Sequence, residues 1–226
     1  MRPTNMGSTS IVTREILMIA LLLIDLQFDF LPGGALAVPN GDLVLPVARS
    51  WMSQRSQFAQ IVATQDWHPD NHLSFAAEHA GKLEGERILV DGVPQVLWPK
   101  HCVQGTRGAE LVLANEPIEV TNGSTSSFDF IARKGMSREV DSYSGFFDNN
   151  RLVKTGLDVH LRGCGITRLV VMGLATDYCV KFTVLDALSL GYRVEVIEAG
   201  CQGVELAPGD SAAALKEMVK NGARLI

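Results

Sequence analysis

Short segments that are apolar from end to end recur along this chain, and they constrain its fold more than any other feature. The clearest are IALLLI at 19–24 and RLVVMGL at 168–174. Segments of this length without alternating polar residues are typical of strands that are buried on both faces. Stretches with helical spacing lie between them. The order therefore predicts a three-layer α/β/α fold with a mainly parallel central sheet.

The remaining elements follow from the same periodicity argument. We expect further strands at 60–64 and 193–199, with weaker ones at 118–122 and 128–133. Helices are expected at 41–56, 152–162, 178–190 and 209–220. Residues 67–108 are rich in Gly, Pro, His and Asn and are expected to form one long loop. A loop of that length inside a compact domain usually carries a functional site.

The 226 residues are expected to form a single domain from 13 to 226, preceded by a flexible N-terminal extension at 1–12. The apolar run at 16–24 resembles the core of a signal peptide. However, Glu15 lies beside it and no small-x-small cleavage site follows. The run is also too short to span a bilayer, so we interpret it as the first buried strand and expect no membrane partner.

Charge and cysteine content narrow the class of protein further. The formal net charge is −5, and no cluster of Lys and Arg with interleaved aromatic residues occurs, which argues against a nucleic-acid partner. The four cysteines are widely separated and form no CxxC pair. This pattern favours a reducing, cytoplasmic location over a disulfide framework. A homo-oligomer stays an open alternative, because the surface helices of such sheets often pair.

Two charged residues follow predicted strands and are candidates for catalysis. Asp25 comes directly after the strand at 19–24, where partial burial would raise its pKa and suit it to act as a general base. The alternative is an ordinary turn or N-cap aspartate. Lys134 follows the strand at 128–133, although a lysine taken alone is more often an exposed surface residue.

The segment ATQDWHPDNH at 63–72 offers ligands for a metal. Asp66 and His68 are two residues apart, and in an extended chain such residues point to the same side. His72 and His101 lie in the same loop region. A mixed oxygen and nitrogen ligand set suits zinc, iron or manganese. The alternative is a group of solvated loop histidines.

Cys179 lies where the strand at 168–174 gives way to the helix at 178–190. Thr176 or Asp177 is expected to cap that helix. In the first turn, free backbone N–H groups and the helix dipole would lower the pKa of the thiol and could also hold an oxyanion. The sequence is therefore consistent with a nucleophile, and the alternative is a packed thiol.

Taken together and in this order, the motifs resemble the nicotinamidases of the isochorismatase-like cysteine hydrolase family. The resemblance covers the chain from about residue 19 to its end. It is carried by six motifs: LLLIDLQFDFLPGGALAVPNG, ATQDWHPDNHLSF, WPKHCVQGTRGAEL, KG, DSYSGFFDN and GLATDYCVKFTVLDA.

The resemblance implies a role for each matching position. It implies a catalytic triad, three metal ligands, an oxyanion hole formed by backbone amides, and aromatic residues that line a ring pocket. The triad positions are Asp25, Lys134 and Cys179, and the metal-ligand positions are Asp66, His68 and His101. The oxyanion-hole amides are those of Ala175 and Cys179, and the ring-pocket residues are Phe28, Trp98 and Tyr178. His72 matches a histidine that is a direct ligand in some members and linked to the metal through water in others. The Leu174–Ala175 bond matches a cis peptide.

The activity implied by the resemblance is hydrolysis of nicotinamide to nicotinate and ammonia through a cysteine thioester, which feeds NAD salvage. Pyrazinamide is an expected second substrate. The implied cofactor is one divalent metal ion, with zinc favoured and iron or manganese as alternatives. Two other functions stay open: a different small-amide hydrolase of the same family, and a non-catalytic protein that binds a pyridine ligand.

Overall fold

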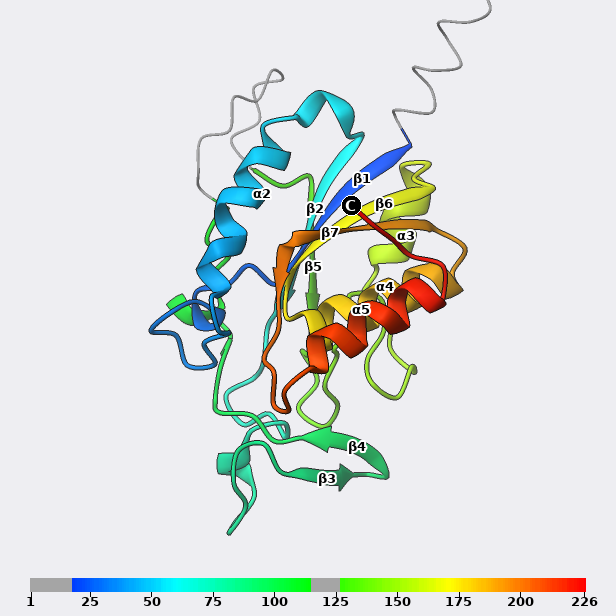
Figure 1. The fold of residues 1–226 in the computed structure, drawn as a ribbon. Helices are drawn as coiled ribbons and strands as arrows, with labels where there is room; N and C mark the ends of the chain where they lie inside the picture. Colours follow the sequence, from blue (N-terminus) through cyan, green and yellow to red (C-terminus); the bar gives the residue numbers. More distant parts are fainter. Residues whose placement is uncertain (1–17, 115–126) are drawn as a thin grey trace, which may run out of the picture.

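The computed structural model describes residues 18–114 and 127–226 and shows a six-stranded sheet between helices (Figure 1). The strand order is β5-β2-β1-β6-β7-β8, and every neighbouring pair is parallel. The strands are β1 Ile19–Ile24, β2 Gln60–Asp66, β5 Phe130–Lys134, β6 Arg168–Leu174, β7 Arg193–Gln202 and β8 Arg224–Leu225. Helix α2 lies on one side of the sheet, and α3, α4 and α5 lie on the other. The predicted three-layer fold is confirmed.

The centre of the sheet explains why its sequence is apolar throughout. All six residues of β1 are buried, and the strand pairs on both edges, with β2 and with β6. Because helices cover both faces, no position of this strand meets water, so no alternation of polar residues is tolerated. The expected boundaries of β1 and β6 agree with the structure.

Two strands run further than their apolar residues indicated. β2 includes Asp66 and β5 includes Lys134 as their last residues, and these two residues are partners in the parallel ladder. Both side chains are buried because they pair with charges rather than meeting solvent. This end of the sheet is therefore lined by charged side chains that are shielded from solvent. Likewise, β7 extends three residues beyond the expected strand, to Gln202.

The region 67–108 is not the single long loop that was expected. It contains an antiparallel hairpin of β3 (Arg87–Val90) and β4 (Val93–Val96). The turn is formed by Asp91 and Gly92, both with positive φ. An Asp-Gly pair between short strands is the usual signal for a tight hairpin, and it was present in the sequence.

The helices are shorter than expected, most of them at the first turn and α2 at both ends. Helix α3 spans Leu157–Gly163, and Leu152, expected inside it, lies outside and is 80% exposed. Gly156 precedes the helix with φ of 90° and sets its start. The structure gives α2 as Val44–Met52, α4 as Lys181–Ser189 and α5 as Asp210–Lys220. The short strand β8 was not predicted.

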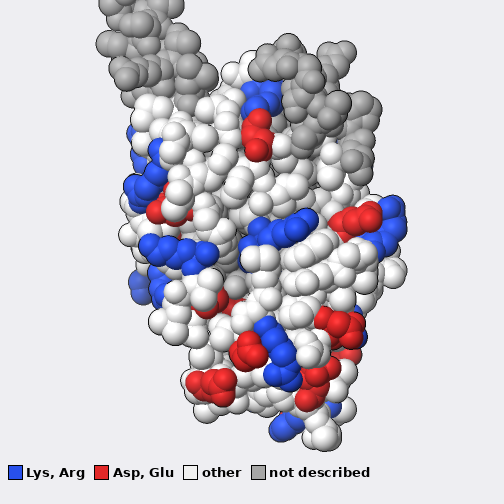
Figure 2. All heavy atoms as spheres, turned by 180° about the vertical axis from the view of Figure 1, so that it is seen from behind, with Lys and Arg blue, Asp and Glu red and all other residues white. Residues whose placement is uncertain are grey.

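Two expectations, the N-terminal extension at 1–12 and the strand at 118–122, lie outside the described residues. Among the helices that the structure describes, none has the length and apolar character needed to cross a bilayer. On the face seen in Figure 2, basic and acidic side chains are interspersed rather than segregated.

Candidate active site

Four charged or nucleophilic side chains meet at the carboxyl ends of four neighbouring strands. Asp66 and Lys134 end β2 and β5, Asp25 directly follows β1, and Cys179 lies five residues after β6. The crevice at this edge of a parallel sheet is where ligands bind in open α/β folds. Because the strands lie side by side, residues from distant parts of the chain come together here.

Lys134 joins these groups into one cluster. Its Nζ lies 2.9 Å from Asp25 Oδ2, 2.5 Å from Asp66 Oδ1 and 3.3 Å from Cys179 Sγ. Burial alone would lower the pKa of Lys134, but the two carboxylates outweigh burial and raise it well above its ordinary value. The ammonium is therefore permanently charged. It also donates to the carbonyl oxygen of Ser142 at 3.0 Å, which fixes its direction.

Asp25 is fully buried, and its backbone has a positive φ of 48°. The hydroxyl of Thr64 donates to Oδ1 at 2.6 Å and so orients the carboxylate. Burial raises the pKa of Asp25 to about 6 against the opposing effect of Lys134, and Asp66 adds to the rise. A carboxylate with that pKa is ionised at neutral pH and still able to take a proton. The pKa of Asp25 moves in the expected direction, although the side chain is fully rather than partly buried.

Cys179 lies in a π-helical turn, Thr176–Val180, that precedes α4. Burial raises the pKa of its thiol well above the ordinary value, Lys134 opposes this, and Asp25 raises it further. The expectation that the turn would lower the pKa of this thiol is wrong, because burial next to carboxylates dominates. A carboxylate oxygen of Asp25 lies within 4.8 Å of the thiol sulfur, so Asp25 is near enough to accept the thiol proton.

The expected helix cap is also wrong. The side chain of Asp177 does not cap α4; it accepts hydrogen bonds from the backbone N–H groups of Val204 and Glu205, at 3.0 and 2.8 Å. This contact ties the loop after β7 to the turn that carries the thiol. The Leu174–Ala175 peptide bond just before that turn is cis, as the resemblance implied.

Asp66, His68 and His101 present ligand atoms that all lie within 4.8 Å of one another. Nδ1 of His68 donates to the carbonyl oxygen of Gly135 at 2.9 Å, and Nδ1 of His101 donates to that of Pro99 at 2.8 Å. In each ring Nε2 is thereby left with its lone pair. Burial lowers the pKa of both histidines to about 4, so both rings are neutral.

This donor set fits a divalent metal. His68 Nε2 is buried without a hydrogen-bond partner and lies 3.8 Å from Asp66 Oδ2. A buried polar atom without a partner is costly, and a bound ion would remove that cost. Backbone carbonyls that fix both tautomers are the usual support of metal-binding histidines.

His72 lies on the other side of His68, in a group with Asp141 rather than with Asp66 and His101. Its Nδ1 accepts a hydrogen bond from the backbone N–H of Ser74 at 3.1 Å. In that tautomer Nε2 carries the hydrogen, and like Nε2 of His68 it is buried without a hydrogen-bond partner. The geometry favours the alternative in which His72 is not a direct ligand.

The small pocket over Cys179 has an aromatic wall. Trp98 and Tyr178 line it as expected, and their rings meet edge to face at 4.9 Å. Phe28 does not line it; its ring instead lies 4.0 Å under the guanidinium of Arg107. Phe30, two residues later, takes that place. Residues of this pocket that the sequence did not single out are Phe30, Leu36, Asp141, Tyr143 and Val204.

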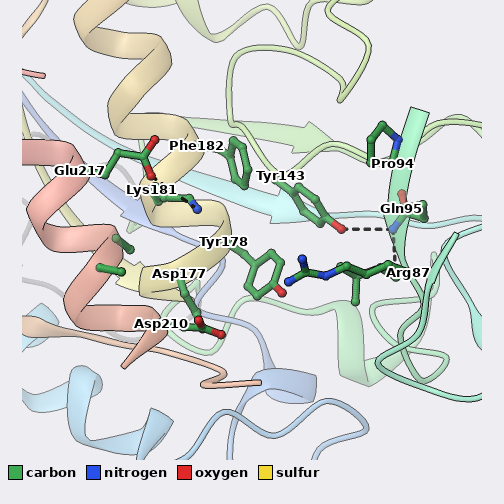
Figure 3. A pocket seen from close by; sticks show the side chains of 13 residues that line it. Arg87, Pro94, Gln95, Tyr143, Asp177, Tyr178, Lys181, Phe182, Asp210 and Glu217 are labelled. Atoms are coloured by element: carbon green, nitrogen blue, oxygen red, sulfur yellow. Dashed lines mark hydrogen bonds and ion pairs between the residues drawn. The ribbon is translucent and has the colours of Figure 1, made fainter. Parts of the chain in front are cut away.

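A larger pocket of about 340 Å³ adjoins the first and shares Tyr143 and Tyr178 with it. It is lined by side chains from the hairpin and from α4 and α5, with Arg87 pointing toward Tyr178 (Figure 3). The amide of Gln95 donates to the hydroxyl of Tyr143 at 3.2 Å and fixes that ring. Tyr143 lies in the motif DSYSGFFDN, but the motif did not indicate a place in the pocket, because that place depends on how the hairpin folds back.

The chain is similar to known proteins in both sequence and fold. The chain is 52% identical to the nicotinamidase of Escherichia coli over 209 residues, covering 91% of this chain and 93% of that protein. A solved nicotinamidase/pyrazinamidase structure from Acinetobacter baumanii superimposes with a TM-score of 0.82 at 41% identity, covering 92% and 95% of the two chains. The structure of Pyrococcus horikoshii pyrazinamidase in complex with zinc gives a TM-score of 0.71 at 35% identity, covering 92% and 98%. The isochorismatase domain matches residues 19–226, and the chain belongs to that family.

Proposed function

We propose that this protein is an amidohydrolase that converts nicotinamide into nicotinate and ammonia and so supplies NAD salvage. The observation that carries the proposal is the contact of one buried ammonium, Lys134, with Asp25, Asp66 and the sulfur of Cys179. A protein that only bound a pyridine would have no use for a thiol held beside a general base. The similarity to the nicotinamidase of Escherichia coli supports the choice of substrate.

The first half of the reaction forms a thioester. Asp25 takes the proton of the Cys179 thiol, and the sulfur attacks the carboxamide carbon of the substrate. Lys134 keeps its charge and stabilises the thiolate as it forms. The backbone N–H groups of Ala175 and Cys179 are assigned to the oxyanion of the tetrahedral intermediate. Asp25 then gives its proton to the nitrogen, the carbon–nitrogen bond breaks, and ammonia leaves.

The second half returns the enzyme to its starting state. A water molecule attacks the thioester carbon while Asp25 accepts one of its protons. The carbon–sulfur bond breaks, Cys179 recovers its proton from Asp25, and the product leaves as nicotinic acid, which ionises to nicotinate in water. One carboxylate with a pKa of about 6 can serve as base and acid in turn, because both of its forms are accessible near neutral pH.

Asp66, His68 and His101 would hold one divalent metal ion, which we take to be zinc, with iron or manganese as alternatives. The zinc complex of the Pyrococcus horikoshii relative supports that choice. When bound, the ion would supply a Lewis acid that coordinates the pyridine nitrogen and orients the ring. Trp98, Tyr178 and Phe30 would pack against the ring faces and edges.

Four cysteines without a disulfide support a cytoplasmic enzyme. Pyrazinamide differs from nicotinamide by one ring nitrogen, so we expect it to be a second substrate.

Ammonia release from purified protein tests the proposal. We expect release from nicotinamide and pyrazinamide, a nicotinoyl adduct on the Cys179 peptide after acid quenching, and little release from an aliphatic amide of similar size. Preference for the aliphatic amide would indicate the other amidase, and nicotinamide binding without ammonia would indicate a binding protein. Chelation should remove activity, and Zn²⁺, Fe²⁺ or Mn²⁺ should restore it.

A further inference from the structure

Gln27 and Asp29 follow Asp25 at intervals of two residues, yet no step of the chemistry uses them. We propose that they are positioning residues, each of which holds a different half of the metal centre. Gln27 holds Asp66, and Asp29 holds the segment that carries the two histidines. The inference rests on the proposed assignment of Asp66, His68 and His101 as ligands.

Gln27 acts as a clamp on the backbone of Asp66. Its side chain is fully buried, its Nε2 donates to the carbonyl oxygen of Asp66 at 2.8 Å, and its Oε1 accepts from the N–H of Asp66 at 2.8 Å. The ladder between β1 and β2 ends at the pair Leu23 and Ala63. Beyond that pair the side chain of Gln27 supplies hydrogen bonds that a neighbouring strand would otherwise supply.

The clamp matters because the carboxylate of Asp66 faces two ways. Oδ1 contacts Lys134 at 2.5 Å, while Oδ2 faces Nε2 of His68 at 3.8 Å. A small shift of the Asp66 backbone would therefore disturb the lysine of the triad and the metal ligands together.

Asp29 acts on the opposite side of the centre, through Cys102. Its Oδ2 accepts the backbone N–H of Cys102 at 2.7 Å, and its Oδ1 accepts that of Ala35 at 3.2 Å. Cys102 has a positive φ of 47°, a conformation that a non-glycine residue adopts only when its neighbours hold it.

Cys102 in turn connects both histidines. It directly follows His101, and its carbonyl oxygen accepts the backbone N–H of His68 at 3.0 Å. Gly108 packs against the same carboxylate, since a Cβ there would lie 2.1 Å from Asp29 Oδ2. One carboxylate thus fixes Cys102, which follows one histidine and holds the backbone of the other, and within the described residues this carboxylate makes no hydrogen bond to the triad.

The effects of losing Gln27 and of losing Asp29 should therefore differ. Loss of Gln27 should weaken metal binding and also disturb the surroundings of Cys179, because Asp66 anchors Lys134. Loss of Asp29 should weaken metal binding alone.

The test uses full-length protein stripped of metal, with two measurements on each variant. Zn²⁺ affinity is measured by competition with a chromogenic chelator, and the alkylation rate of Cys179 by iodoacetamide is measured in the metal-free protein by peptide mass spectrometry. We expect Gln27→Met to weaken Zn²⁺ binding about 10–100-fold, the range typical when partners of metal ligands are lost. It should also slow alkylation at least about threefold, because the ammonium is no longer held against the sulfur.

Asp29→Ala should weaken Zn²⁺ binding over the same range of about 10–100-fold, yet leave alkylation within about twofold of the parent. Asp29→Asn keeps an acceptor for Cys102 and should recover part of that affinity. Gly108→Ala displaces the carboxylate without removing it and gives a second test if Asp29→Ala does not fold.

Two matched controls separate positioning from loss of a buried hydrogen bond. Gln65 donates to the carbonyl of Ala109 at 2.8 Å, as Gln27 does at 2.9 Å, but does not hold Asp66. For Asp29 the control is Asp129, an exposed aspartate that likewise accepts a backbone N–H, that of Ile61 at 2.6 Å at the other end of β2, and also pairs with Arg55 at the surface. Gln65→Met and Asp129→Ala should leave both measurements unchanged.

Equal effects of Gln27→Met and Gln65→Met, or of Asp29→Ala and Asp129→Ala, would overturn the inference. So would slowing of alkylation in Asp29→Ala to the extent seen in Gln27→Met. A parent protein that binds no stoichiometric metal would overturn the proposed metal centre itself, together with the assignments that rest on it.

Discussion

The triad and the histidines of this site lie a few ångströms apart but are supported in different ways. Asp25 and Lys134 stand at the ends of strands in a hydrogen-bonded sheet, and Cys179 lies in the turn that follows β6. His68 and His101 belong to an irregular segment that side-chain hydrogen bonds hold in place. The sheet therefore positions Asp25, Lys134 and Asp66, whereas the two histidines proposed as metal ligands depend on hydrogen bonds made outside the sheet.

The two halves also differ in charge. The triad half contains the Lys134 ammonium and two carboxylates. Its contribution to the stability of the fold therefore depends on keeping these buried charges paired. The histidine half contributes two neutral imidazoles whose pKa values are lowered to about 4 by burial. Asp66 belongs to both halves, through Lys134 on one oxygen and the histidines on the other.

The largest expected effect comes from removing the nucleophile. Cys179→Ala should lower kcat by at least about 10⁴-fold, because no other group can form the thioester. Metal content and the melting temperature should stay at parent values if the halves are as separate as their supports suggest. Residual turnover within tenfold of the parent would remove Cys179 from the chemistry, and loss of bound metal would break the comparison.

Replacing the base should have the next largest effect. Asp25→Asn keeps the shape and the bond to Thr64 but cannot accept a proton, so kcat should fall about 10²–10⁴-fold. In the parent, Asp25 must be ionised to act, and its pKa is raised to about 6. We therefore expect kcat/KM to fall about tenfold per pH unit below about pH 6 and to level off above it.

Pre-steady-state ammonia release measures the fall in rate in Asp25→Asn and, in the parent, its dependence on pH. A flat profile between pH 5 and 7 would exclude Asp25 as the titrating base.

Lys134→Met tests the link between the halves through stability. Removing one partner of a buried ion-pair cluster leaves uncompensated carboxylates and costs about 3–5 kcal/mol of unfolding free energy. Urea denaturation at pH 7 measures this loss, which should shrink at pH 5 as the carboxylates take up protons. Lys100→Met is the matched control, since Lys100 pairs with Asp70 at the surface and should contribute at most about 1 kcal/mol. Similar losses for both lysines would contradict the buried network.

The smallest expected effect concerns the ring pocket. Phe30→Ala should raise KM for nicotinamide about tenfold, the usual scale for removing an apolar contact with a ligand. Phe28→Ala should leave KM within about twofold, because Phe28 stacks under Arg107 outside the pocket. Steady-state kinetics decide between them, and the reverse pattern would restore the assignment made from the sequence.

The sequence was most informative where a residue directly adjoins a buried strand. The apolar run before Asp25 and the run before the Cys179 turn located both residues at one edge of the sheet. It was least informative where position depends on a distant segment. Phe28 and Phe30 look alike in the sequence, and only the packing against the loop at 98–109 distinguishes them.

The pKa of Cys179 shows a different limit of prediction from sequence. The position of Cys179 after a strand was predicted correctly, but the local turn suggested a thiol with a lowered pKa. Burial is the main cause of the raised pKa, and the carboxylates that add to it come from β2 and from the residue after β1, far away in the sequence. Desolvation depends on the whole fold, so a local motif gives the identity of the group without its electrostatic environment.

Gly135 follows Lys134 with φ of 62°, and its carbonyl oxygen accepts the hydrogen of His68 Nδ1. A Cβ at this position would lie 2.4 Å from Cε1 of the same imidazole. Two consecutive residues thus serve both halves of the site: Lys134 supplies the cation of the triad, and Gly135 holds the imidazole of His68. In a saturation mutagenesis screen, position 135 should tolerate as few replacements as its neighbour, although glycine offers no side chain for chemistry. An insertion or deletion between the two would disturb both halves in a single event.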